Sequence, residues 1–158
     1  MNAGRRRGGS RPALRLRVQL ATRCRRVPPL RQFTRWAHAA LARPAEITLR
    51  VVGEREGARL NRDYRGRRHA TNVLAFCYEG GERLAGDIVL CAPVIAREAL
   101  AQHKGLESHY AHLTVHALLH LQGFEHDSAR GARVMEAREV ELLHGLGYPD
   151  PYLEIPSR

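Results

Sequence analysis

Three histidines lie close together in the segment "VHALLHLQGFEHD", at positions 116, 120 and 126 around Gly123. Residues four apart on an α-helix share one face, so His116 and His120 are placed to reach the same metal ion. A glycine at position 123 favours a left-handed helix end, which turns the chain back and lets His126 supply a third imidazole. Three neutral nitrogens leave a fourth tetrahedral position for water, as in catalytic zinc sites. We therefore predict one metal ion held by His116, His120 and His126, Zn²⁺ before the nickel or copper that three imidazoles also suit.

The same HxxxHxxGxxH spacing occurs in metzincin proteases, where a glutamate after the first histidine acts as the general base. Here that position is Ala117, whose methyl group cannot take a proton from water. Peptide hydrolysis by that route is therefore excluded. Zinc still lowers the pKa of its water to about 7, so hydrolysis of a different substrate stays open. Glu125 and Asp127 flank His126 and are candidate bases, hydrogen-bonding partners of the ligands, or simply caps and solvated side chains.

Other histidines of the chain receive different interpretations. His112 stands one helical turn before His116, and we expect it to contact a ligand or the substrate, because a fourth protein ligand would close the open position of the metal. We expect His103, His109 and His144 on the surface.

The positive charge of the chain is concentrated at its N-terminal end. The 158 residues have a formal net charge of +10, and twelve arginines, but no Asp or Glu, precede Glu46. Such a field favours a polyanionic partner, nucleic acid before an anionic membrane surface. The arginine-rich start is also compatible with an organellar transit peptide, but its alternating, strand-like pattern favours a structural segment.

The length suits one domain, and we predict a basic flexible arm over residues 1–12 and a single domain over 13–158. The three cysteines are widely spaced and form no CxxC pair, which favours a reducing compartment. No apolar run reaches the length of a membrane span.

Hydrophobic periodicity predicts the elements that must position the histidines. Alternating residues indicate a strand over 13–21, and the segment 27–44 has helical spacing, with Leu30 and Phe33 on its apolar face and Trp36 packed beside it. Further strands are expected over 46–53, 71–79 and 86–93, the last two joined in a hairpin-like connection. Helices are expected over 54–66, 93–105, 108–123 and 128–147. This order predicts an α+β fold, a mixed sheet of about four strands packed with helices.

From Leu60 onward the chain resembles the YbeY family of zinc-dependent bacterial endoribonucleases. The resemblance rests on "HALLHLQGFEH", on "LNRDYRGRRHATNVLAF", on the "GDI" strand at Gly86, and on "VMEAREVELL". It implies that the three histidines bind zinc and that Arg65, in the matched "YR", faces the site as a catalytic residue together with His116. A guanidinium suits this role because it can hold two phosphate oxygens at once. The chain departs from the family pattern at Ala70, Ala75, Ala117 and Glu125.

The resemblance further implies a cytoplasmic, single-strand-specific endoribonuclease in ribosomal RNA processing (16S rRNA 3′-end maturation) and ribosome quality control. Its expected partners are ribosomal RNA, the ribosomal small subunit, and ribosomal or GTPase proteins, with no membrane partner. Two alternatives stay open: a zinc peptidase or amidase that uses Glu125 or Asp127 as base, and a non-catalytic ribosome-associated RNA-binding factor whose metal is structural.

Overall fold

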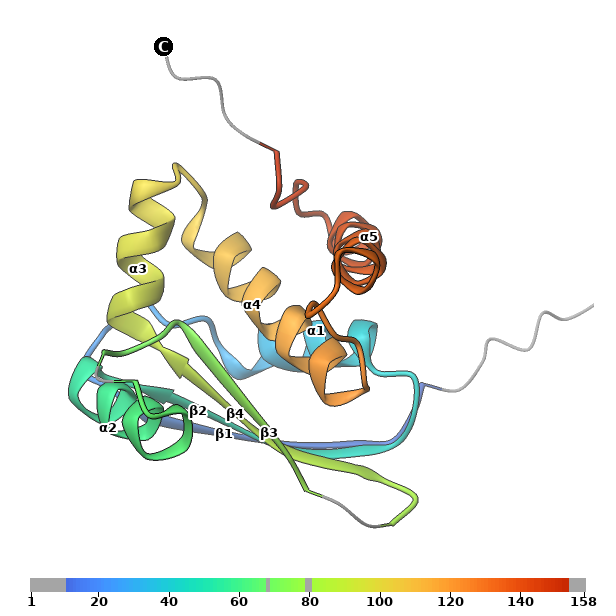
Figure 1. The fold of residues 1–158 in the computed structure, drawn as a ribbon, viewed down its shortest axis with the longest axis horizontal. Coiled ribbons are helices and arrows are strands. Elements are labelled where there is room, and N and C mark those ends of the chain that lie inside the picture. The colour runs from blue at the N-terminus through green and yellow to red at the C-terminus, as the bar shows by residue number, and fades with distance from the viewer. Residues whose placement is uncertain (1–10, 68, 79–80, 154–158) are drawn as a thin grey trace, which may run out of the picture.

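The structure of the protein is a computed structural model that describes residues 11–67, 69–78 and 81–153. The elements follow the expected order (Figure 1). They are β1 (Leu14–Ala21), α1 (Leu30–Ala40), β2 (Ala45–Val52), α2 (Glu54–Arg65), β3 (Val73–Tyr78), β4 (Leu84–Cys91), α3 (Ala92–Ala101), α4 (Leu106–Leu121) and α5 (Ala129–Gly145). Residues 1–10 lie outside the described part, so the basic arm over 1–12 stays a prediction.

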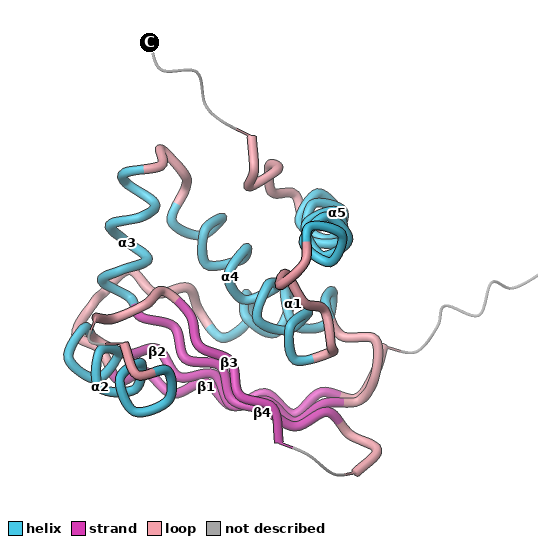
Figure 2. The backbone as a smooth tube through the Cα atoms, viewed as in Figure 1, coloured by secondary structure: helices cyan, strands magenta, loops and turns pink. Residues whose placement is uncertain are grey.

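The strands form one mixed sheet in the order β1-β2-β4-β3 (Figure 2). β1, β2 and β4 are parallel, and β3 pairs antiparallel with β4. Parallel neighbours need a crossover, which α1 provides between β1 and β2. The predicted α+β class and four-stranded mixed sheet are confirmed.

Four helices, α1, α3, α4 and α5, lie on one side of the sheet, and α2 lies on the other (Figure 1). The main core forms between the sheet and the first group, and its largest fully buried side chains include Phe33, Trp36 and Tyr110. The Trp36 indole donates a hydrogen bond of 3.1 Å to the hydroxyl of Tyr148. The packing of Trp36 is as expected, but Leu30 is 54% exposed, because it is the first residue of α1 and projects past the core.

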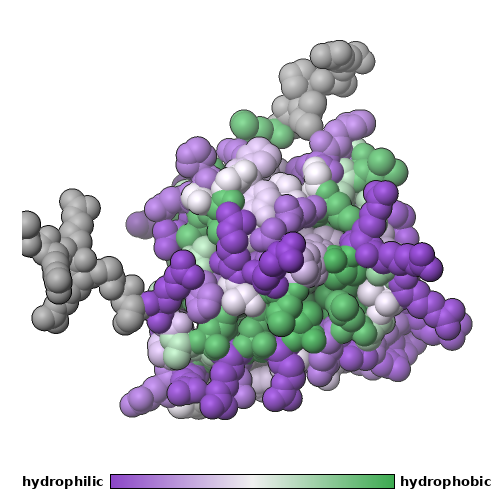
Figure 3. Space-filling view, turned by 180° about the vertical axis from the view of Figure 1, so that it is seen from behind, coloured by the Kyte–Doolittle hydropathy of each residue, from purple (hydrophilic) through white to green (hydrophobic). Residues whose placement is uncertain are grey.

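A smaller apolar cluster lies under α2, on the opposite face of the sheet, and consists of Val52, Leu74, Val89 and Cys91. α2 covers only one end of that face (Figure 1). Along β1, Leu16 and Val18 pack against the main core while Arg15 and Arg17 are exposed, which is the alternation expected of a half-buried strand. Seen from behind, the molecule shows a band of apolar side chains surrounded by long hydrophilic ones (Figure 3).

Among the helices of the described residues, none combines the length and the apolar character required to span a membrane.

Candidate metal centre and active site

The end of α4, the helix that carries His116 and His120, packs closely on the sheet. At Gly86 on β4, an added Cβ atom would lie 2.7 Å from the carbonyl oxygen of Phe76 and 3.0 Å from the Leu121 side chain at the end of α4. Only glycine leaves room for this approach. The C-terminal end of α4 is therefore held directly against β3 and β4, and His116 and His120 line a pocket together with Val73 and Ala75 of β3.

The chain reverses after α4 as the sequence predicts. Gly123 adopts a φ of 99°, and the backbone N–H groups of Gly123 and Phe124 donate to the carbonyls of His120 and Leu119 at 3.0 and 3.1 Å. The ring centre of His126 then lies 5.6 Å from that of His116 and 6.3 Å from that of His120. Imidazoles that ligate one tetrahedral zinc at 2.0–2.1 Å place their ring centres roughly 5 Å apart, so both of these separations are longer than a shared ion requires.

One pocket of about 150 Å³ joins the predicted site residues. Its lining comes from the end of α2, the start of β3, the face of α4 and the following loop. The structure thus brings together the four residues that were predicted to act jointly, and it adds neighbours from β3. The lining residues are Arg65, Thr71, Asn72, Val73, Ala75, His116, Ala117, His120 and His126.

Arg65 reaches this pocket because α2 ends there. It is the last residue of α2, and Gly66 closes the helix with a φ of 68°. The loop that follows is tied back by Asn61, a fully buried residue whose amide donates to the carbonyl of His69 at 2.6 Å. This bond fixes the path from the helix to β3, so the exposed guanidinium of Arg65 and the side chain of Asn72 share one cavity wall.

Glu139 on α5 is a residue of the site that the motif did not reveal. Its side chain is fully buried, and its carboxylate lies 2.5 Å from Nδ1 of His116 and 3.0 Å from Nε2 of His112. The hydroxyl of Tyr152 donates to it as well. Burial by itself raises the pKa of Glu139, but the hydrogen bonds from His112, His116 and Tyr152 outweigh it and lower the pKa to about 2. The carboxylate is therefore ionised at neutral pH.

Two overlapping groups of side chains could hold a metal ion. The donor atoms of His112, His116 and Glu139 all lie within 4.8 Å of one another. The predicted ligands His116, His120 and His126 line the adjacent pocket and share His116 with this group. When Nδ1 of His116 binds the carboxylate, Nε2 is left for a metal, an arrangement that orients many metal-binding histidines.

His109 does not lie on the surface, and that prediction is wrong. It is only 4% exposed, because its face of α4 packs against α3, where Nε2 lies 3.1 Å from a carboxylate oxygen of Glu98. Burial lowers the pKa of His109, and the hydrogen bond to Glu98 only partly opposes this. A neutral imidazole therefore belongs to the folded state.

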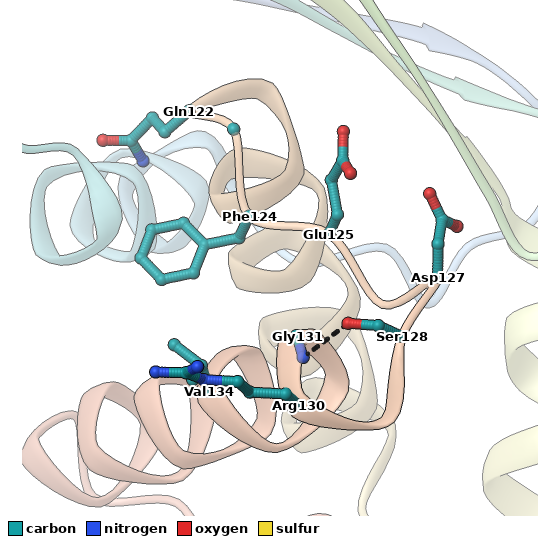
Figure 4. A pocket seen from close by; sticks show the side chains of 9 residues that line it. Gln122, Phe124, Glu125, Asp127, Ser128, Arg130, Gly131 and Val134 are labelled. Carbon is teal, nitrogen blue, oxygen red and sulfur yellow. Dashed lines mark hydrogen bonds between the residues drawn. The ribbon is translucent and has the colours of Figure 1, made fainter.

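The two candidate bases, Glu125 and Asp127, line a separate, larger pocket of about 620 Å³ next to the histidine pocket. Both side chains point to one side of the loop between α4 and α5, while Phe124 points elsewhere (Figure 4). The side chain of Ser128 caps α5 by accepting from the N–H of Gly131 at 2.9 Å. In this structure neither carboxylate forms part of the wall of the histidine pocket.

A pocket lined by three imidazoles and an arginine suits the hydrolysis of phosphate esters, and comparisons with known proteins give the family. The model of the family described as "Endoribonuclease YbeY" matches residues 29–147. The chain belongs to this family of nucleases.

Curated relatives agree over nearly the whole length. A protein of Aromatoleum aromaticum named Endoribonuclease YbeY is 54% identical over 153 residues, which cover 96% of this chain and 99% of the relative. One of Methylobacillus flagellatus with the same name is 53% identical over 141 residues, or 89% of this chain and 95% of the relative. The solution structure of TM1509 from Thermotoga maritima is 19% identical with a TM-score of 0.58, covers 90% of this chain and 99% of that one, and supports the fold.

Proposed function

We propose that this protein is a cytoplasmic, Zn²⁺-dependent endoribonuclease that cleaves single-stranded RNA in ribosomal RNA processing, at the 3′ end of 16S rRNA, and in ribosome quality control. One observation carries the proposal. Three imidazoles and the guanidinium of Arg65 line a single pocket of about 150 Å³ in a chain of the endoribonuclease YbeY family. Imidazoles suit a divalent metal and the guanidinium suits a phosphate.

In this proposal His116, His120 and His126 hold the ion, and Glu139 orients His116. We prefer these three ligands to the group that includes Glu139 because the Glu139 carboxylate already has several hydrogen-bonding partners. It is surrounded by two imidazoles and the hydroxyl of Tyr152, all within hydrogen-bonding distance. A carboxylate so engaged is a typical hydrogen-bonding partner of a metal-binding histidine. When bound, Zn²⁺ supplies Lewis-acid chemistry and a nucleophile near neutral pH.

Arg65 positions the scissile phosphate and offsets the negative charge that develops during attack on phosphorus. Its place at the end of α2 lets it line the same pocket as the imidazoles of α4 and the following loop. A longer RNA would gain further contacts from exposed arginines of the N-terminal third, Arg15 and Arg17 on β1 among them. Such contacts are sequence-independent and weaken as salt rises.

The direct test measures metal and cleavage together. The purified protein should contain one zinc per chain by elemental analysis and should cut single-stranded fragments of small-subunit ribosomal RNA. His120→Ala should lose metal and cleavage, while Arg65→Ala should keep the metal and lose cleavage by at least about 100-fold, the usual effect of removing a group that stabilises transition-state charge. Arg138→Ala, which removes a half-buried arginine that pairs with Glu141 on α5, is the matched control.

Each alternative function predicts a different outcome. A His120→Ala protein that folds and binds RNA normally but cannot process it would exclude the non-catalytic factor with a structural metal, whereas joint loss of folding and RNA binding would favour that factor. Zinc-dependent turnover of peptides without RNA cleavage would favour the peptidase or amidase. In cells that carry the His116→Ala protein as their sole copy, unprocessed 3′ ends of 16S rRNA should accumulate, and normal ends would contradict the proposed pathway.

A further inference from the structure

Asn72 is held in one orientation at the wall of the histidine pocket. It lies immediately before β3, and its carbonyl accepts the backbone N–H of Cys91 at 2.9 Å, which anchors its main chain to β4. Its side-chain amide nitrogen donates to both carboxylate oxygens of Glu98 on α3, at 3.0 and 3.3 Å. Neither the backbone nor the side chain of this residue is therefore left to rotate freely.

The carboxylate of Glu98 is in turn held by a hydrogen bond to His109 on α4. Nε2 of His109 lies 3.1 Å from the same carboxylate oxygen that accepts the shorter bond from Asn72. The ring is almost completely buried, and burial lowers its pKa, so it stays neutral. A carboxylate only accepts hydrogen bonds, so the proton of the neutral ring must be on Nε2. A chain of hydrogen bonds thus runs from inside α4, through α3, to the pocket wall.

This chain determines which end of the Asn72 amide meets the substrate. Because Glu98 only accepts, the NH₂ group must face Glu98, and the carbonyl oxygen Oδ1 must point to the other side. None of the described residues donates a hydrogen bond to Oδ1. Asn72 lines the pocket beside Arg65 and the three histidines. Glu98 is not among the lining residues, so we infer that the Oδ1 end of the amide faces the pocket that Arg65 also lines.

We propose that Oδ1 of Asn72 accepts a hydrogen bond from the ribose 2′-hydroxyl next to the scissile phosphate, and so selects RNA over DNA. The inference rests on the proposed endoribonuclease function. Phosphate oxygens are acceptors and would be repelled by Oδ1, so the partner must be a donor. In RNA the 2′-hydroxyl is the donor nearest to the phosphodiester, and it is the group that DNA lacks. Glu98 and His109 act as positioning residues for this contact.

The experiment compares binding of two short single-stranded oligonucleotides to the metal-loaded, full-length protein. One is RNA, and the other has the same sequence with 2′-fluorine in place of every 2′-hydroxyl, which removes the donor. Fluorescence anisotropy is read on ice, before cleavage is detectable on a gel. The unmodified protein should bind RNA about 3- to 10-fold more tightly than the fluorinated strand, the value of one hydrogen bond.

In Asn72→Ala this preference should disappear through a loss of affinity for RNA, with the affinity for the fluorinated strand unchanged. Glu98→Ala leaves Asn72 in place but frees its amide to rotate, so it should give an intermediate ratio. It also tests the idea if Asn72→Ala does not fold. Gln32→Ala is the matched control, because its amide also donates to a carboxylate, that of Glu107 at 2.8 Å, outside the pocket.

An unchanged ratio in both variants, an equal loss of affinity for both strands, or no preference in the unmodified protein would overturn the inference. These outcomes are distinct from failure of the proposed function. A protein that prefers RNA through Asn72 but cleaves no RNA would refute the function and leave the recognition standing. Normal cleavage with an unchanged ratio in Asn72→Ala would refute the recognition alone.

Discussion

Replacing Glu139 by glutamine tests how the metal centre is organised. The substitution keeps the size of the side chain and removes its charge. In the structure the carboxylate lies 2.5 Å from Nδ1 of His116 and 3.0 Å from Nε2 of His112, entirely shielded from solvent. An amide has one accepting oxygen, so it can satisfy one imidazole N–H and must turn its NH₂ group toward the other ring.

The expected size of the effect follows from the hydrogen bond to His116. A charge-assisted hydrogen bond contributes about 1.5–3 kcal/mol net and a neutral one about 1 kcal/mol, so the exchange costs about 0.5–2 kcal/mol. If that energy orients His116 for the metal, zinc affinity should fall about 2- to 30-fold. The upper part of this range overlaps the loss usual for partners of metal-binding histidines, about 10- to 100-fold.

The assay is a competitive zinc titration against a chromogenic chelator, on Glu139→Gln and on Glu136→Gln. Glu136 lies on the same helix one turn earlier, is exposed, and should leave zinc affinity unchanged. The Glu139→Gln protein should still bind one zinc per chain, with RNA cleavage restored when zinc is in excess.

Two results would refute this reasoning. Unchanged affinity in Glu139→Gln would mean that the carboxylate does not orient His116. Complete loss of zinc in Glu139→Gln, together with full retention in His120→Ala, would show that His112, His116 and Glu139 are the ligands, as the short separations among their donor atoms allow.

Three further effects are expected. Because burial lowers the pKa of His109 below its ordinary value of 6.5, the unfolded chain takes up its proton first. As the pH drops below about 6.5, the free energy of unfolding of the metal-free protein should therefore decrease, and His109 should contribute at most about 1.4 kcal/mol per pH unit to this decrease. Urea titrations should show a smaller decrease in His109→Asn. Arg31 and Arg35 line a basic pocket of about 540 Å³. Replacing both by glutamine should flatten the salt dependence of RNA binding by roughly 0.7 per lost phosphate contact, whereas Arg138→Gln should not. Gly123→Ala forces an L-residue to a φ of 99°, which should cost about 1–2 kcal/mol by chemical denaturation and weaken zinc binding in the same titration.

The order of helices and strands could be predicted because each has its own periodicity. Alternating residues mark β1, and the spacing of Phe33 and Ala37 marks α1, whose buried side confirms the pattern. The hairpin-like connection predicted the pairing of β3 with β4, which is antiparallel as such a connection requires. Local patterns do not determine how strands far apart in the sequence pair, so the rest of the order β1-β2-β4-β3 emerged only from the structure. Leu30 was misplaced for a related reason: periodicity identifies a face of a helix but not how far its end extends beyond the core.

Residues of the site outside the histidine motif were harder to predict, because their partners are distant in the sequence. Glu139 meets His116 across 23 residues, and His109 meets Glu98 on another helix. A usable signal existed for the first. Met135, Glu139 and Leu143 recur every four residues on α5, and all three are buried. An acidic residue inside an apolar helical stripe needs a partner in the core, and two neighbouring histidines are natural ones.

The absence of a glutamate at position 117 is consistent with an anionic substrate. Ala117 is 1% exposed and lines the pocket, and among the described lining residues there is no carboxylate. A carboxylate 4 Å from a phosphodiester would repel it by about 4 kcal/mol at an effective dielectric constant of 20. Glu139, the acid that serves the histidines, instead reaches His116 from α5 and is fully buried. A protease can place its base in the pocket because a peptide is neutral; here the carboxylate contacts His116 from α5, and Arg65 lines the pocket.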